Sequence, residues 1–154
     1  MEDLIRTFYD GFARLDTDAM ASCYHPDIVF EDPAFGELRG QRAMQMWQML
    51  CASQKNKDFK LTYSQLEADS DRGSVVWEPI YEFSKTGRSV HNIIRAEFEF
   101  KDGKIFRHRD HFSLHRWAHQ AMGLKGWLMG GTGFFKRKLQ ATSNHMLDRF
   151  IAKG

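Results

Sequence analysis

Two ionisable residues share the apolar face of one predicted strand. Residues 104–115 alternate in polarity, which is typical of a strand whose successive side chains point to opposite faces of a sheet. Ile105 falls on the charged face. The apolar face carries Phe106, His108, Asp110, Phe112 and Leu114. Burying an ionisable side chain costs free energy unless the side chain is paired or hydrogen-bonded, so its presence on a buried face can indicate a role in binding or catalysis.

This face is therefore a candidate pocket. We predict that Asp110 is a general base or a ligand anchor, and that His108 donates a hydrogen bond to it or acts as the acid. Asp32 ends a predicted short strand and would enter the same pocket. The alternative is that His108 and Asp110 simply satisfy each other inside the core.

Neighbouring predicted strands add aromatic and polar groups to this interior. Tyr81 and Asn92 are the most informative, because a buried hydroxyl and a buried amide need partners that a bound carbonyl or hydroxyl group would supply. An apolar cavity with a few polar anchors is the usual small-ligand site, so we expect a small hydrophobic ligand. The residues predicted to contact it are Tyr81, Asn92, Trp77, Phe83, Phe112 and Phe8.

The sequence predicts neither a metal site nor a cofactor. His108 and Asp110 face opposite to His111 and His115 on the strand, so no set of two histidines and a carboxylate converges. The glycine-rich residues 126–133 lack the preceding strand and the Lys-Ser or Lys-Thr ending of a phosphate loop. We interpret that stretch as a flexible hinge.

Composition indicates one folded, soluble protein. The 154 residues are 42% hydrophobic, and the formal net charge of +2 is too small to indicate nucleic acid. No apolar stretch is long enough to span a membrane, and the acidic start lacks a signal-peptide pattern. We therefore expect a cytoplasmic protein with no membrane or nucleic-acid partner. Cys23 and Cys51 are expected to be buried free thiols.

Apolar residues follow helical spacing in the first third of the chain, alternate with polar residues in the middle, and follow helical spacing again near the C-terminus. We predict helices at residues 2–14, 41–53, 116–122 and 134–152, and a short helix containing Met20, Cys23 and Tyr24 that Asp16 or Thr17 caps. Strands are predicted at residues 28–32, 59–63, 74–85, 90–100 and 104–115. Pro79 interrupts one of them, so an edge position or a bulge is expected there.

Several motifs carry a family resemblance when taken in order. They are Phe8-Tyr9-Asp10-Gly11-Phe12, Leu15-Asp16-Thr17-Asp18, the run from Tyr24 to Pro33, and Arg109-Asp110-His111-Phe112. The chain resembles the SnoaL-like proteins of the nuclear transport factor 2-like superfamily. The resemblance implies an α+β cone, in which a curved antiparallel sheet wraps around helices. We expect a cone domain at residues 1–120, and a hinge and helix at residues 121–154 that pack on it.

The resemblance also implies candidate chemistry. In ketosteroid isomerase relatives the Asp-Pro carboxylate is the base, which corresponds to Asp32. Their oxyanion-binding Tyr and Asp correspond here to Phe8 and Ala96, so steroid isomerisation is disfavoured. Limonene epoxide hydrolase relatives share only Asp110, since Ile94 and Ala96 replace the other two polar residues. Polyketide cyclase relatives use a last-strand acid as base, and Asp110 matches it.

Two classes of function stay open at this point. One is a cofactor-independent isomerase, cyclase or epoxide-hydrolase-like enzyme that uses Asp110 as base. The other is a non-catalytic ligand-binding or scaffold module. The outer sheet face suits a homodimer interface, and the last helix suits a lid or a dimer contact. The interface residues we expect are Val76, Ile80 and Ile93, mixed with Glu78, Glu82 and Arg95.

Overall fold

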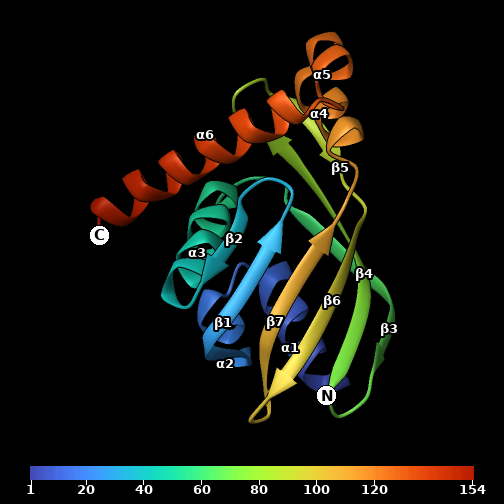
Figure 1. The fold of residues 1–154 in the computed structure, drawn as a ribbon, viewed down its shortest axis with the longest axis vertical. Coiled ribbons are helices and arrows are strands. Elements are labelled where there is room, and N and C mark those ends of the chain that lie inside the picture. Colours follow the sequence, from blue (N-terminus) through green and yellow to red (C-terminus); the bar gives the residue numbers. More distant parts are fainter.

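A curved seven-stranded sheet covers the helices of the N-terminal half on one side (Figure 1). The computed structural model describes residues 1–154. The helices are α1 (Glu2–Ala13), α2 (Thr17–Cys23), α3 (Gln41–Gln54), α4 (Leu114–Met122), α5 (Leu124–Met129) and α6 (Gly133–Ala152). The strands are β1 (Tyr24–Asp32), β2 (Gly36–Arg39), β3 (Lys60–Ala68), β4 (Arg72–Phe83), β5 (Arg88–His91), β6 (Ile94–Lys101) and β7 (Lys104–His111). The predicted α+β cone is thereby confirmed.

The sheet order is β2-β1-β7-β6-β4-β3, with β5 added to β4. Only β1 and β7 pair in parallel, and this pairing places the two strands that carry Asp32 and Asp110 side by side. The inner face of the sheet and the helices α1 to α3 enclose one apolar core. As the alternation predicted, Val75 and Trp77 of β4 and Ala96 and Phe98 of β6 are buried in it.

Helix α2 begins directly after Asp16, one of the two capping residues that the sequence predicted. The backbone N–H of Ala19 donates to Asp16 Oδ1 at 3.0 Å, which satisfies one of the free N–H groups of the first turn. Tyr24 does not continue this helix, contrary to the sequence-based expectation. It opens β1, and its side chain turns into the core with 6% of its surface exposed.

Pro79 marks the point at which β4 changes partner. Residues up to Trp77 pair with β6, and residues from Ile80 pair with β5. Pro79 has no N–H to donate, but its carbonyl accepts from Asn92 N–H at 3.1 Å. The predicted irregularity at Pro79 therefore lies in the partner strand, which breaks at Asn92 between β5 and β6. The Asn92 side chain lies in the interior, with 6% of its surface exposed.

The first half of β7 departs from the predicted alternation. Glu99 pairs with Arg107 and Phe100 with Ile105, so Phe106 is an extra residue in β7. Ile105 is consequently fully buried, whereas Phe106 is half-buried and packs against His25 and Lys101. The prediction placed these two residues on the wrong faces, because strict alternation cannot reveal a β-bulge.

The C-terminal region is more ordered than its glycines indicated. The predicted hinge contains a helix, α5, which follows α4 directly through Gly123. Helix α6 then crosses α3 (Figure 1). Leu147 of α6 is fully buried, and Arg42 of α3 bonds to Asp148 Oδ1 at 2.7 Å and to Asn144 Oδ1 at 3.0 Å.

Truncating Leu147 should show that α6 is integral to the fold. Leu147→Ala should lower the free energy of unfolding by about 2–5 kcal/mol, because it leaves a cavity where a fully buried side chain stood. Met146→Ala is the matched control, since 46% of Met146 is exposed, and it should cost less than about 1 kcal/mol. Urea unfolding measures both. Equal effects would mean that α6 is detached from the core.

Candidate functional site

Four hydrogen bonds link five buried side chains into one chain across the core. Trp47 Nε1–H donates to the Tyr24 hydroxyl at 2.9 Å, and that hydroxyl lies 2.7 Å from His108 Nδ1. His108 Nε2 lies 3.0 Å from Asp110 Oδ1, which also accepts from Trp77 Nε1–H at 3.3 Å. We refer to these five residues as the buried polar chain. It joins α3, β1, β7 and β4.

One arrangement of protons satisfies every donor in this chain. If the Tyr24 hydroxyl accepts from Trp47, its own hydrogen is free to donate to an unprotonated His108 Nδ1. His108 then carries its proton on Nε2 and donates it to the carboxylate of Asp110. A doubly protonated His108 would leave the Tyr24 hydrogen without an acceptor. The network therefore assigns the His108 proton to Nε2, which donates a hydrogen bond to Asp110 Oδ1.

The predicted pair of His108 and Asp110 is present but lies within the core. His108 is fully buried and 3% of Asp110 is exposed. His108 is also enclosed by the rings of Phe8, Phe30 and Trp47. Phe8, predicted to contact ligand, is fully buried and stacks on Tyr24 with ring centroids 5.2 Å apart.

A cavity of about 270 Å³ opens beside this core. Its wall comes from the end of α3, the second half of β4, the Asp32–Phe35 turn and one face of α6. Five of the residues predicted to contact a ligand line it, whereas Phe8, His108 and Asp110 do not. These five residues are Trp77, Tyr81, Phe83, Asn92 and Phe112.

Asp32 is the titratable group on the cavity wall with the most unusual environment. Burial raises the pKa of its carboxyl to about 7, against two hydrogen bonds that oppose the rise. These come from the backbone N–H groups of Phe35 and Ala34, which donate to Oδ1 at 2.6 and 2.9 Å. The negative charge of Asp110 raises the pKa further. A carboxyl with this pKa changes its charge near neutral pH.

Three other side chains on the wall have unused hydrogen-bonding capacity. The Tyr81 hydroxyl accepts from Trp117 Nε1–H at 2.8 Å, so its own hydrogen is free to donate. Asn92 Oδ1 accepts from the Ile93 N–H at 3.1 Å, which leaves its NH₂ group without a partner. Gln54 Oε1 is buried and has no partner. Two donors and one acceptor are thus available to a ligand.

The charge of Asp32 also affects the pKa of Tyr81. Burial raises the pKa of Tyr81, the bond from Trp117 lowers it, and the charge of Asp32 raises it again. The wall therefore combines a carboxyl and a hydroxyl that influence each other within one apolar space.

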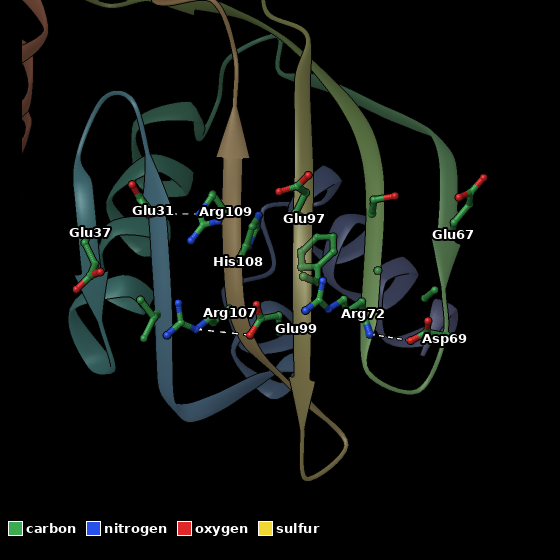
Figure 2. Close-up of a pocket in the computed structure, with 15 residues that line it drawn as sticks. Glu31, Glu37, Glu67, Asp69, Arg72, Glu97, Glu99, Arg107, His108 and Arg109 are labelled. Atoms are coloured by element: carbon green, nitrogen blue, oxygen red, sulfur yellow. Dashed lines mark hydrogen bonds and ion pairs between the residues drawn. The ribbon is translucent and has the colours of Figure 1, made fainter. Parts of the chain in front are cut away.

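A larger hollow of about 520 Å³ lies on the sheet face that no helix covers (Figure 2). Figure 2 shows charged side chains from β1, β7 and β6 lying across it. Arg109 Nε lies 3.4 Å from Glu31 Oε2, and Arg107 Nε lies 3.6 Å from Glu99 Oε2. These exposed pairs stabilise little. The smaller inner cavity, with its desolvated carboxyl, is the better candidate ligand site.

Sequence reasoning missed Tyr24, Trp47 and Gln54. Tyr24 and Trp47 sit in apolar helical patterns that gave no sign of a shared hydrogen bond. Tyr9 is also fully buried, and its hydroxyl has no partner. Burial raises the pKa of Tyr9 and the charge of Asp110 adds to the rise.

Removing one hydroxyl at a time should separate Tyr24 from Tyr9. Tyr24→Phe leaves Trp47 Nε1–H and His108 Nδ1 unpaired in the core, so it should lower the free energy of unfolding by about 2–4 kcal/mol. Tyr9→Phe removes an unpartnered hydroxyl and should change stability by less than about 1 kcal/mol, or raise it. Thermal and urea unfolding compare the two. A larger loss for Tyr9→Phe would contradict the hydrogen-bond assignment.

Comparison with solved structures places this architecture among nuclear transport factor 2-like folds. A protein of unknown function with that fold from Burkholderia pseudomallei is 16% identical, with a TM-score of 0.66, over 78% of this chain and 95% of the other. A putative polyketide cyclase from Sinorhizobium meliloti is 26% identical, with a TM-score of 0.56, over 71% and 94%. A hypothetical protein with a ketosteroid isomerase-like fold from Catenulispora acidiphila, in complex with trimethylamine, is 12% identical, with a TM-score of 0.62, over 77% of this chain and 91% of the other.

The sequence itself matches a protein family over most of the cone. No curated protein matches it, but the profile of the SnoaL-like domain matches residues 5–108, which is more than half of the chain. The match spans α1 to the middle of β7 and leaves α4, α5 and α6 outside. The predicted resemblance is confirmed, and the chain belongs to the SnoaL-like domain family.

Proposed function

We propose that the inner cavity binds a small hydrophobic carbonyl compound and that Asp32 transfers a proton to and from it. The observation that carries the proposal is a carboxyl with a pKa of about 7 on the wall of an apolar cavity. A base is most effective when its pKa lies near the working pH, because it is then both available and strong enough.

The reaction would need no cofactor. The Asp32 carboxylate removes a proton from the carbon next to the ligand carbonyl, and the electron pair moves onto the carbonyl oxygen as an enolate. The Tyr81 hydroxyl and the Asn92 NH₂ group donate hydrogen bonds to that oxygen. Asp32 then returns the proton to another carbon of the same conjugated system. The product is an isomer of the substrate, with no net change in atoms or electrons.

This proposal moves the base from Asp110, which the sequence favoured, to Asp32. Asp110 Oδ1 already accepts from two buried donors, and the side chain is absent from the cavity wall. Its proposed role is that of a fixed negative charge that helps to raise the pKa of Asp32.

A non-catalytic binding module is the second candidate. The same cavity would serve it, and a scaffold with no ligand would instead have this space filled by aromatic side chains. The cavity volume of about 270 Å³ thus supports ligand binding in either case.

We further propose that two copies pair through the outer sheet face. Ile80 and Ile93 are 39% and 41% exposed there, among the charged residues named above. Light scattering after size-exclusion chromatography should give twice the chain mass of 18.0 kDa. Ile93→Lys should shift the mass toward a monomer, and a wild-type monomer would contradict the pairing.

Isotope exchange tests the proton-transfer step. In deuterium oxide near neutral pH, the wild-type protein should exchange the protons beside the carbonyl of hydrophobic cyclic ketones, followed by NMR. Asp32→Asn should slow this exchange by about 100-fold or more, while ketone binding, measured by tryptophan fluorescence, is retained. Binding without exchange in the wild-type protein would favour the binding module.

Asp110→Asn is the matched variant for the identity of the base. It should slow exchange less than Asp32→Asn, because it removes only a neighbouring charge. If Asp110→Asn abolished exchange and Asp32→Asn did not, Asp110 would be the base.

The stability of the fold should also report the pKa of Asp32. The folded pKa of about 7 exceeds the ordinary value of 3.8, so the folded state holds this proton more tightly than the unfolded state. The contribution of Asp32 to the free energy of unfolding is therefore fully present below about pH 4 and is lost as pH rises through about 7. The free energy of unfolding of Asp32→Asn, relative to that of the wild type, should therefore rise by on the order of 3 kcal/mol between pH 4 and pH 8.

Asp69→Asn provides a control of opposite sign. The N–H groups of Arg72 and Asp71 lower the pKa of the exposed Asp69 carboxyl. The contribution of Asp69 to the free energy of unfolding is present above the ordinary pKa of a carboxyl group and is lost as pH falls. Urea unfolding at several pH values measures both variants, and a pH-independent effect of Asp32→Asn would contradict the raised pKa.

A further inference from the structure

Helix α5 and the start of α6 lie at one end of the molecule (Figure 1). Large apolar side chains are exposed together on these two segments. We refer to them as the apolar tip. Its members are Leu124 (71% exposed), Trp127 (51%), Leu128 (65%), Met129 (44%) and Phe134 (59%). Single exposed apolar residues are common on protein surfaces, but five of them within eleven residues indicate an interaction site.

The packing of α5 holds these side chains outward. Gly126 and Gly130 lie one turn apart on the face of α5 that meets α4, and both are buried. A Cβ atom at Gly126 would overlap the carbonyl of Ala118, and one at Gly130 would come within 2.6 Å of Ala118 Cβ. The helix therefore packs through its glycines, and Leu124, Trp127 and Leu128 occupy the opposite face. His115 Nε2 bonds to the Trp127 carbonyl at 2.6 Å and fixes this arrangement.

The chain segment that forms the tip carries only positive charge. Residues 111–147 contain no Asp or Glu but five of the 22 Lys and Arg residues, which leaves 17 against all 20 acidic residues elsewhere. The five are Arg116, Lys125, Lys136, Arg137 and Lys138. All five are exposed and none forms an ion pair with an acidic side chain.

Helical spacing places some of these charges beside the apolar tip. Arg137 and Lys138 lie three and four residues after Phe134, and so on the same face of α6. Lys125 likewise lies three and four residues before Leu128 and Met129 of α5. Exposed apolar side chains and unpaired cations thus form one surface.

We propose that this surface docks the protein on bilayers that contain anionic lipids. Trp127 would sit at the level of the headgroups, and Leu124, Leu128 and Phe134 would enter the acyl boundary. Lys125, Arg137 and Lys138 would contact lipid phosphates. None of the helices combines the length and the hydrophobicity needed to cross a bilayer, so this is attachment to the surface. It replaces the expectation that there is no membrane partner.

A second copy of the chain fits the tip less well. A symmetric contact between two tips would bring the same unpaired cations together, and like charges across an interface are repulsive. An anionic bilayer matches both the apolar side chains and the cations. The inference depends on the tip alone and holds whether or not the cavity is catalytic.

Vesicle sedimentation tests the inference directly. The wild-type protein should bind phosphatidylcholine vesicles that contain phosphatidylserine at least about tenfold more tightly than phosphatidylcholine alone, and added salt should weaken the binding. The emission of Trp127 should shift to shorter wavelength on binding, a change that Trp127→Phe should remove. Absence of sedimentation, or equal binding to both vesicles, would overturn the proposal.

Matched variants identify the surface responsible. Leu124→Ser with Leu128→Ser should abolish binding, and Arg137→Glu with Lys138→Glu should remove the preference for phosphatidylserine. Lys55→Glu with Lys60→Glu makes the same change in net charge at exposed lysines outside the tip and should leave the preference for phosphatidylserine unchanged. If Leu124→Ser with Leu128→Ser altered only the oligomeric mass, the tip would bind a second copy, and the proposal would fail.

Discussion

The buried polar chain from Trp47 to Trp77 is the constraint on which the rest of the structure depends. Each of its members lies where water cannot replace a lost partner, so each fixes the next within hydrogen-bond distance. Because the five residues come from α3, β1, β7 and β4, the chain sets the depth at which α3 enters the curved sheet. The aromatic rings of Phe30, Trp47 and Phe98 pack around His108 and complete this centre.

The polar side chains of the core and those of the cavity wall form two different sets. His108 and Asp110 use their hydrogen-bonding capacity on neighbouring side chains. The groups on the cavity wall, Asp32, Tyr81 and Asn92, retain unused capacity and face a space of ligand size. Two links join the sets: the charge of Asp110 raises the pKa of Asp32, and Trp77, which bonds to Asp110, also lines the cavity.

Sequence periodicity predicted most of the helices and strands, and the family resemblance predicted the cone, but neither gave the depth of each residue. Alternation correctly placed Trp77, Tyr81 and Asn92 on the inner face, because the pleat of a strand is a local property. It failed at Phe106, where a bulge depends on the partner strand, and at residues 124–129, where tight packing on Ala118 stabilises a glycine-containing helix. Tyr24, which bonds to His108, and Trp47, which stacks on its ring, lie 84 and 61 residues away in sequence, and only the tertiary fold brings them together. The unusual pKa of Asp32 arises from burial, which no local pattern encodes.

Helix α6 supplies part of the cavity wall from outside the segment shared with the family. Leu139, Thr142, Ser143 and Met146 line the space, whereas the family match ends at residue 108. The buried polar chain lies almost wholly within the shared segment. Substitutions along one face of an added helix can therefore change the shape and polarity of the cavity without disturbing the core. For the proposed ligand site, changes in ligand preference would in this way be separated from changes in the stability of the core.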